Sequence, residues 1–375
     1  MEKLNNKTLF FRIWVKVLIL FLLFNVIFAV IYRRIPYGKI TLYNHLIPGR
    51  ERFPYGENAR LSYNLTINNI DALFASHIVN AQSNLSDRYR VFIIGDSSIW
   101  GTLLMPDETL PSQIGMYLQK RFENKKIQVF NLGYPAMSLM KDLIILDNSL
   151  QFNPDLIIWA VTLESFPKKS QLEHPIVKQN SHLVNELISK YELDLDSLPE
   201  EINIFNNSII GQRRNLADLI RLQFYGFIWA ATEVDQFYPT SFTPALRDLE
   251  KDYRFKEFEL NQLKDSDLSF NVIENFVNKN PHIKVVIINE PILISNGSNS
   301  DVRYNYYYPR WAYDAYLDIM NEHMMENGIE YYDLWDLIPE MYFTNTAIHL
   351  SPEAIAIYAS SIVDNLNDYL MEILE

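Results

Sequence analysis

Hydrophobic positions follow two patterns in this chain, one continuous near the N-terminus and one interrupted through the rest. In the interrupted part, short apolar runs rich in β-branched residues alternate with stretches that have helical spacing. This alternation predicts an α/β fold with a five-stranded parallel sheet, wound on both faces by helices. The predicted strands span residues 90–94, 127–132, 155–161, 283–289 and 329–334.

The helical stretches lie between and around these strands. The alternation pauses between about residues 167 and 279, which predicts a mostly helical insert. Within the insert, the apolar segment 216–232 contains Asp218 and Arg221, and these charges favour a buried or interfacial amphipathic helix over a second membrane span. The predicted helices span residues 70–79, 112–124, 137–152, 191–201, 216–232 and 311–327, with a last one from Ser351 or Pro352 onward.

The continuous pattern is a run of apolar residues from Ile13 to Tyr32. About 20 residues at helical rise match the hydrocarbon core of a membrane. The sequence Arg33-Arg34-Ile35-Pro36 offers no small-residue cleavage site, which favours an uncleaved anchor over a signal peptide. We therefore expect a tail and anchor (1–34), a connector that packs on the body (35–89), and the body itself (90–375). Positive residues flank both ends of the run, with a slight preference for a cytoplasmic N-terminus and an extracytoplasmic body.

Composition narrows the possible functions. The 375 residues carry a net charge of -13, of which residues 1–34 contribute +5 and the rest -18. An acidic body is a poor partner for nucleic acid. The chain has no cysteine, which excludes disulfides and thiolate chemistry, and its seven histidines show no metal-ligand spacing, so no metal or other cofactor is expected.

Two residues are candidates for nucleophilic chemistry. Ser97 follows the first predicted strand in a Gly-Asp-Ser turn, and His349 lies in a loop before the last helix. Both positions face the carboxyl ends of the strands, where active sites of open α/β sheets lie, and a histidine can take the proton of a serine hydroxyl. The alternative is structural: Asp96 or Ser97 could be only a helix cap, and His349 an ordinary loop residue.

Four blocks of sequence together carry a resemblance to a known family. In this order and at these positions they resemble the SGNH/GDSL hydrolases, from about Arg90 to the C-terminus, with the insert interrupting the similarity. The resemblance implies a flavodoxin-like three-layer fold and a serine ester hydrolase or acyltransferase. The blocks are Gly95-Asp96-Ser97-Ser98, Asn131-Leu132-Gly133-Tyr134-Pro135-Ala136, Pro154-Asp155 and His349-Leu350-Ser351-Pro352-Glu353.

The resemblance implies roles for individual residues. Ser97 would be the nucleophile and, through its backbone N–H, an oxyanion donor, with His349 as the base. Ala136 stands where the family has an oxyanion-hole glycine, and Thr162 is the candidate substitute for an asparagine that is missing beside Leu163. Thr346 stands where an aspartate would orient the histidine, with Asn345 next to it.

These residues predict a membrane-anchored esterase or O-acyltransferase that acts on an acylated envelope carbohydrate or a similar ester, with a membrane acyltransferase as a conceivable partner. Tyr307, Arg310 and Trp311 are candidates for lining a carbohydrate-binding cleft, or else for aromatic packing. The alternative function is a non-catalytic binding or assembly protein of the envelope that has kept the fold.

Overall fold

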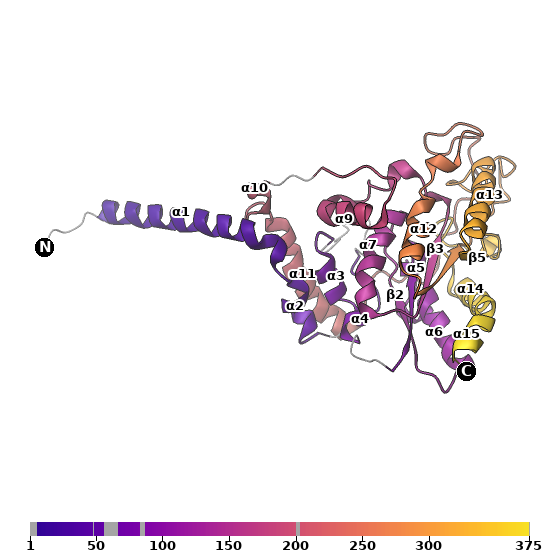
Figure 1. The fold of residues 1–375 in the computed structure, drawn as a ribbon, viewed down its shortest axis with the longest axis horizontal. Coiled ribbons are helices and arrows are strands. Elements are labelled where there is room, and N and C mark those ends of the chain that lie inside the picture. Colours follow the sequence, from indigo (N-terminus) through magenta and orange to yellow (C-terminus); the bar gives the residue numbers. More distant parts are fainter. Residues whose placement is uncertain (1–5, 48, 56–66, 83–86, 200–202, 375) are drawn as a thin grey trace.

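A parallel five-stranded sheet forms the centre of the protein (Figure 1). The computed structural model describes residues 6–47, 49–55, 67–82, 87–199 and 203–374. Neighbouring strands run parallel in the order β2-β1-β3-β4-β5, which is the flavodoxin-like order. All five predicted strands are confirmed: β1 Tyr89–Ile94, β2 Ile127–Asn131, β3 Leu156–Val161, β4 Lys284–Asn289 and β5 Glu330–Asp333.

Helices cover both faces of the sheet and give it three layers (Figure 1). Because successive side chains of a strand point to opposite faces, Phe92 and Ile94 of β1 join one core while Val91 and Ile93 join the other. The first core packs under α7 Leu139–Ser149, α9 Ser181–Tyr191, α12 Phe270–Lys279 and α13 Arg310–Glu326. The second packs under α6 Leu110–Arg121, α14 Pro352–Asn365 and α15 Asn367–Leu374.

Two helix predictions differ from the structure, and one helix was not predicted. The segment 70–79 forms two helices, α3 Ile70–Ala75 and α4 Ile78–Ala81, because His77 leaves the helical path and caps α4 through its ring nitrogen. The helix predicted over 191–201 is wrong in its described part: α9 ends at Tyr191, and Glu192 takes a left-handed backbone with φ 53°. Helix α12 lies at the end of the predicted insert and was not predicted, although its apolar face packs in the first core.

Helix α1 Asn6–Ile31 extends away from the body (Figure 1). Among the helices of the described chain, only α1, over Thr8–Ile31, is long and apolar enough to cross a membrane, as an anchor or a signal sequence would be. The insert contributes α8 Pro175–Gln179, α10 Ile204–Asn207 and α11 Arg213–Thr232, while residues 233–264 contain no α-helix. The remaining short helices are α2 Tyr37–Ile40 in the connector and α5 Ser97–Trp100 after β1.

Candidate active site

Ser97 is the first residue of the short helix α5, directly beyond the carboxyl end of β1. The carboxylate of Asp96 caps this helix, since its Oδ1 accepts a hydrogen bond from the Ser98 backbone N–H at 2.7 Å. As the first helical residue, Ser97 has a backbone N–H without a partner inside the helix. Gly101 ends α5 with φ 85°, a conformation in which glycine carries no Cβ strain. The cap therefore belongs to Asp96, and the Ser97 hydroxyl is left for another partner.

That partner is His349, which precedes α14. The Ser97 Oγ lies 2.8 Å from His349 Nε2, across 252 positions of sequence. The Ser351 side chain caps α14 with Pro352 as its first residue, as predicted, and this fixes the end of the His349 loop. Burial lowers the pKa of His349 to about 4, so its imidazole is neutral near pH 7.

Asn345 orients the histidine ring. Its Oδ1 lies 2.9 Å from His349 Nδ1. An amide oxygen can only accept, so Nδ1 carries the proton and Nε2 is left as the acceptor for the Ser97 hydroxyl. Thr346, the other candidate, accepts the His349 backbone N–H through its Oγ1 at 3.1 Å and does not contact the ring nitrogens. Of the two residues considered from the sequence, Asn345 is the one that contacts the ring.

The candidate oxyanion residues are only partly brought together. Ala136 lies in the cleft beside Ser97, with an unusual positive φ of 99°, which is a backbone region that glycine adopts more readily. Thr162 is fully buried, and its hydroxyl donates to the Tyr308 phenol oxygen at 3.1 Å. Neither Thr162 nor the buried Leu163 lines the cleft. The side chain expected to replace the missing asparagine therefore does not reach Ser97.

A cleft of about 440 Å³ opens over Ser97 and His349. Tyr307 lines this cleft, whereas Arg310 stacks on Tyr304 and Trp311 donates its indole N–H to the Tyr253 carbonyl, so Arg310 and Trp311 lie elsewhere. No group of three or more potential metal ligands occurs within the described ranges. The cleft also has polar walls that the sequence did not reveal: Ser138, Glu164, Ser170, Glu173, His174 and Lys256.

Two of these polar residues form an ion pair at the cleft wall. Lys256 Nζ lies 2.8 Å from Glu164 Oε1, and it also donates to the Ser170 hydroxyl at 3.1 Å. Burial raises the pKa of Glu164, although the Lys256 charge works against this rise. The lysine comes from the insert and the glutamate from the turn after β3, so the insert closes one side of the cleft.

A buried cluster lies beneath the Ser97 turn; we call it the acid cluster and define it as Asp96, Lys141, Asp142 and Glu290. Lys141 Nζ donates to the Gly95 carbonyl at 2.8 Å and to the Tyr134 carbonyl at 2.9 Å, and it pairs with Asp142. Gly95 is two residues before Ser97, and Tyr134 is two residues before Ala136. One ammonium group therefore joins the two turns that form the floor of the cleft.

The carboxyls of the acid cluster are buried together with this single lysine. Burial raises the pKa of Asp142 to about 6 and that of Asp96 above its ordinary value. For Glu290, burial and the nearby Asp96 charge raise the pKa far above its ordinary value, although it accepts a hydrogen bond from the Ser98 hydroxyl. The cluster therefore favours protonated carboxyls at its centre.

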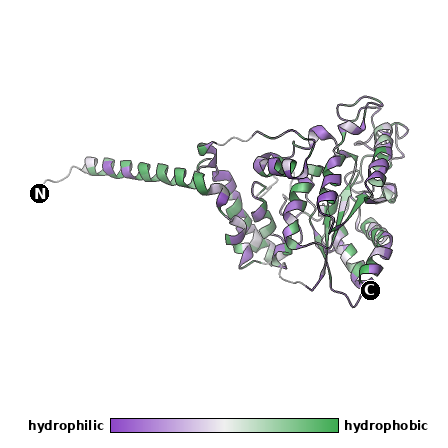
Figure 2. Cartoon of the chain, viewed as in Figure 1, coloured by the Kyte–Doolittle hydropathy of each residue, from purple (hydrophilic) through white to green (hydrophobic). Residues whose placement is uncertain are grey.

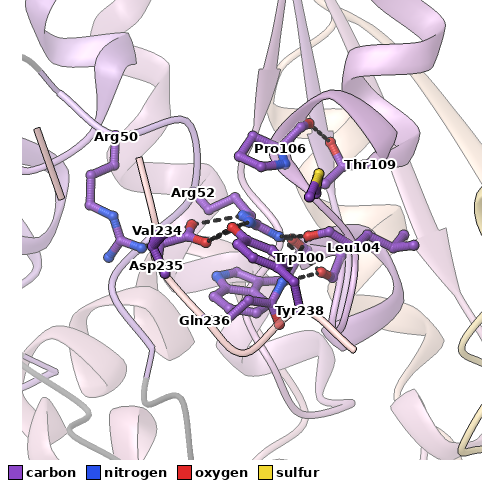
Figure 3. Close-up of polar contacts among 12 residues, drawn as sticks. Arg50, Arg52, Trp100, Leu104, Pro106, Thr109, Val234, Asp235, Gln236 and Tyr238 are labelled. Atoms are coloured by element: carbon purple, nitrogen blue, oxygen red, sulfur yellow. Dashed lines mark hydrogen bonds and ion pairs between the residues drawn. The ribbon is translucent and has the colours of Figure 1, made fainter. Parts of the chain in front are cut away.

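A second buried cluster holds the loop after α5 (Figure 3); we call it the arginine cluster and define it as Arg50, Arg52 and Asp235. Arg52 binds the Asp235 carboxylate through Nε at 2.9 Å and Nη2 at 2.6 Å. Its Nη1 donates to the carbonyls of Gly101 and Leu104, both at 2.9 Å. Arg50 approaches the same carboxylate at 3.0 Å. The connector and the insert therefore meet at the end of the Ser97 helix.

Sequence reasoning missed both clusters, for different reasons. Lys141 and Asp142 stand side by side in the otherwise apolar run 139–146, and such a buried pair is a signal that could have been used. Glu290 directly follows β4 and could have been placed at the same sheet edge as Ser97. Arg52 and Asp235 are 183 positions apart in segments without regular strands, and no local pattern connects them.

Comparisons with known proteins add little to this geometry. No family model matches the chain, and no curated protein matches it. Structural likenesses include an alpha/beta hydrolase enzyme from the metagenome of Lake Arreo (11% identity, TM-score 0.37, covering 74% of this chain and 94% of that one). A carbohydrate acetylesterase family member from Sinorhizobium meliloti is 12% identical, with TM-score 0.34 and coverages of 76% and 99%. An acetylxylan esterase from Geobacillus stearothermophilus is 10% identical, with TM-score 0.35 and coverages of 74% and 93%. At these TM-scores the likenesses do not identify a function for this chain.

Proposed function

We propose that this chain is a serine esterase or O-acyltransferase, similar to the SGNH hydrolases, that acts on an acylated envelope carbohydrate or a similar ester. One observation carries the proposal: Ser97 Oγ lies 2.8 Å from His349 Nε2, while Asn345 Oδ1 lies 2.9 Å from His349 Nδ1. An activated serine requires a neutral imidazole that accepts from its hydroxyl, and an acceptor that orients this imidazole. The cleft above them leaves room for a substrate.

The reaction follows from these contacts. His349 Nε2 takes the Ser97 proton as Oγ attacks the ester carbonyl carbon, and the bond to the leaving alcohol then breaks as the proton passes to that alcohol's oxygen. The acyl group stays on Ser97 until water or a sugar hydroxyl attacks it with the same proton transfers. Asn345 holds the imidazole in the required tautomer but, being neutral, stabilises the imidazolium less than a carboxylate would.

The developing negative charge on the ester oxygen needs donors, and we assign them to backbone groups. The Ser97 N–H at the start of α5 is one donor, and the N–H of Ala136 in the neighbouring turn is the second. Thr162 is not included, since its hydroxyl is engaged with Tyr308. A site with two donors in place of three is slower, because one such donor contributes about 10²–10³-fold to the rate.

The proposed organisation places α1 as an uncleaved membrane anchor, residues 35–89 as a connector, and residues 90–375 as an extracytoplasmic body. The support is the length and apolar character of Thr8–Ile31, whose residues are mostly unburied by the body. Arg33 and Arg34 follow this span after Tyr32. A membrane acyltransferase that supplies acyl groups is a partner compatible with this placement.

An active-serine fluorophosphonate probe tests the proposed function. We expect the full-length protein in detergent or membranes to be labelled, and Ser97→Ala to remain unlabelled. Ser98→Ala is the matched control, because the neighbouring hydroxyl faces Glu290 and not His349. Labelling that is lost in Ser98→Ala but kept in Ser97→Ala would show that Ser98, and not Ser97, is the reactive serine.

A folded wild-type protein that neither reacts with the probe nor hydrolyses p-nitrophenyl acetate would contradict the enzyme proposal. That result would favour the non-catalytic binding protein, for which the specific support is the apolar Leu163 and the engaged Thr162 at the position of the missing donor. Thermal unfolding of both variants at the wild-type temperature is the control for folding.

A further inference from the structure

The end of α1 is fixed to the insert by a polar contact. Asn25, the only polar residue deep in the apolar run, is buried, and its Oδ1 accepts the backbone N–H of Ile210 at 3.1 Å. Its Nδ2 donates to the Phe21 carbonyl at 2.9 Å within the same helix. Ala29, one turn further, is also buried, and α10 packs against α1 at this level. The segment around α10 therefore lies at the depth of Asn25.

This depth can be compared with the thickness of a membrane. The hydrocarbon core takes about 20 helical residues, and any such window within Thr8–Ile31 contains Asn25. At a rise of about 1.5 Å per residue, Asn25 then lies roughly 3–9 Å inside the boundary that faces the body. Because Ile210 contacts Asn25, the segment beside α10 reaches the same boundary. If α1 is the proposed anchor, the body meets the lipid boundary at this second place.

Two residues of α10 at this level are apolar and exposed, and they precede two half-buried asparagines. In α10, Ile204 is 63% exposed and Phe205 is 59% exposed. Helix α11 begins nearby and runs along the side of the body from which α1 emerges (Figure 1). One face of α11 carries large apolar residues at helical spacing, each at least half exposed: Ile220, Phe224, Phe227 and Ile228.

The charges around these apolar residues suit a membrane surface. Arg213 and Arg214 are exposed at the start of α11, nearest to α10, whereas the body as a whole is acidic. Figure 2 shows α1 as mostly hydrophobic, with some hydrophilic positions in its N-terminal half, and α11 as a mixture of hydrophobic and hydrophilic positions. An apolar stripe with flanking arginines is typical of a helix that lies in the interface with its apolar side about 5–10 Å deep.

We propose that α10 and α11 form a docking surface that lies in the lipid interface beside the anchor, with anionic headgroups near Arg213 and Arg214. The inference rests on the proposed membrane anchor but not on the chemistry of Ser97. The docking surface also connects to the site, because the chain leaves α11 through Asp235 and Gln236. Gln236 donates directly to carbonyls of the loop after α5, whereas Asp235 acts on this loop through Arg52 (Figure 3). The membrane then sets the orientation of the Ser97 cleft as well as its distance from the bilayer.

Lipid quenching tests this proposal on the full chain. Since the chain has no cysteine, single thiols can be placed at Phe224→Cys on the docking surface, Leu18→Cys in α1, and Met325→Cys on α13, which is exposed on the far side of the body. Each is labelled with a fluorophore in vesicles of phosphatidylcholine and phosphatidylglycerol that contain nitroxide-labelled acyl chains. We expect several-fold stronger quenching at positions 18 and 224 than at position 325.

Each other outcome overturns the proposal. Quenching at 18 with none at 224 would leave an anchor whose body stands clear of the bilayer. Absence of quenching at 18 would remove the membrane anchor on which the docking rests. Fluorophosphonate labelling of the same variants measures the serine chemistry separately. A failure of the proposed function can therefore be distinguished from a failure of the docking proposal. The double substitution Arg213→Glu, Arg214→Glu is expected to reduce quenching at 224 but not at 18, and equal quenching at 224 would exclude the assigned role of the two arginines.

Discussion

The start of helix α5 lies on the acid cluster, whereas the loop after its end is held by the arginine cluster. Both clusters are buried and both bind backbone carbonyls beside the Ser97 helix. They differ in how charge is balanced: the acid cluster has three carboxyls for one lysine, and the arginine cluster has one carboxylate for two guanidinium groups. A buried carboxyl can become neutral by taking up a proton, but a guanidinium stays charged.

The difference shows in the direction of the pKa shifts. Burial raises the pKa of Asp142 to about 6, so this carboxyl adjusts to its surroundings. Burial alone would also raise the pKa of Asp235, but the charges of Arg52 and Arg50 outweigh it and hold the pKa below its ordinary value. When a charged residue of the acid cluster is removed, the remaining carboxyls can therefore take up protons. The arginine cluster cannot adjust in this way, because its two guanidinium groups pair with one carboxylate.

The largest effect is expected from removing that carboxylate. Asp235→Ala removes the carboxylate that pairs with both buried guanidinium groups, and breaking a buried ion pair typically costs about 3–5 kcal/mol. The free energy of unfolding, measured by urea titration, should fall by this amount. The control is Asp364→Ala, which removes the more exposed pair with Arg121 and should cost less than about 1 kcal/mol. Equal losses in both variants would refute the importance assigned to the arginine cluster.

A smaller loss of stability, with a larger loss of rate, is expected from Lys141→Met. The carboxyls beside it can take up protons, so stability should fall by only about 1–3 kcal/mol, the cost of buried acceptors losing a donor. The turns of Ser97 and Ala136 lose their shared ammonium, and a misplacement of about 1 Å can lower a rate about 100-fold. The rate of fluorophosphonate labelling measures this. Lys190→Met, on the surface of α9, is the control and should change neither quantity appreciably.

The two clusters should give opposite pH dependences of stability. The raised pKa of Asp142 contributes stability that is complete below its ordinary pKa of 3.8 and is lost as the pH rises to about 6. The lowered pKa of Asp235 contributes stability above the ordinary value, lost as the pH falls below it. The free energy of unfolding should be measured with urea between pH 3 and 7. As the pH rises, wild type should lose stability relative to Asp142→Asn and gain stability relative to Asp235→Asn. Parallel curves for all three proteins would contradict this assignment.

His349 is a buried titratable group outside both clusters, and the residue beside its ring, Asn345, is neutral. Its pKa of about 4 predicts that activity falls only as the pH drops toward that value, because the protonated ring cannot accept the Ser97 proton. In Asn345→Asp, the nearby carboxylate should raise the His349 pKa, moving the acid limb of kcat/KM to higher pH. An acid limb that stays in place would mean that Asn345 does not control the ring.

The smallest effect is expected at the turn that Lys141 holds from below. Ala136 has a positive φ of 99°, which strains a residue that carries a Cβ. Relieving this backbone strain outweighs the conformational entropy that glycine adds to the unfolded chain. Ala136→Gly should therefore raise the free energy of unfolding by about 1 kcal/mol. Ala160→Gly, inside β3, is the matched control and should lower it. Destabilisation by both changes would show that the Ala136 turn is unstrained.

Much of the fold could be predicted because its signals are local. Each strand is a compact apolar run, and the turn after β1 and the cap of α14 can be recognised from a few neighbouring residues. The pair Ser97 and His349 could be proposed because each lies beside such a landmark, Ser97 after β1 and His349 before α14. The details depend on packing across the sheet. Asn345 and Thr346 are adjacent in sequence, and only the path of the loop decides which side chain reaches the ring.

Other parts of the site could not be predicted from local patterns. Thr162 lies directly after β3, where the missing donor would stand, but its hydroxyl donates to Tyr308 from a loop far away in the sequence. Arg310 and Trp311 belong to an aromatic stretch that suited a binding cleft, yet their partners turn them away from it. Lys256 reaches the cleft from a part of the insert without regular structure. These contacts result from long-range packing, which sequence periodicity does not encode.

The contact between Asn25 and Ile210 has a consequence for the order of folding. On the proposed topology, α1 enters the membrane early in synthesis, when Ile210, 185 residues later, does not yet exist. During that interval the Asn25 side chain can bond only within its own helix, through Nδ2 to Phe21, and its oxygen remains an open acceptor near the lipid boundary. Completion of the insert closes this acceptor. On the proposed topology, the hydrogen bond between Asn25 and Ile210 therefore stabilises the arrangement in which the body folds back against the membrane.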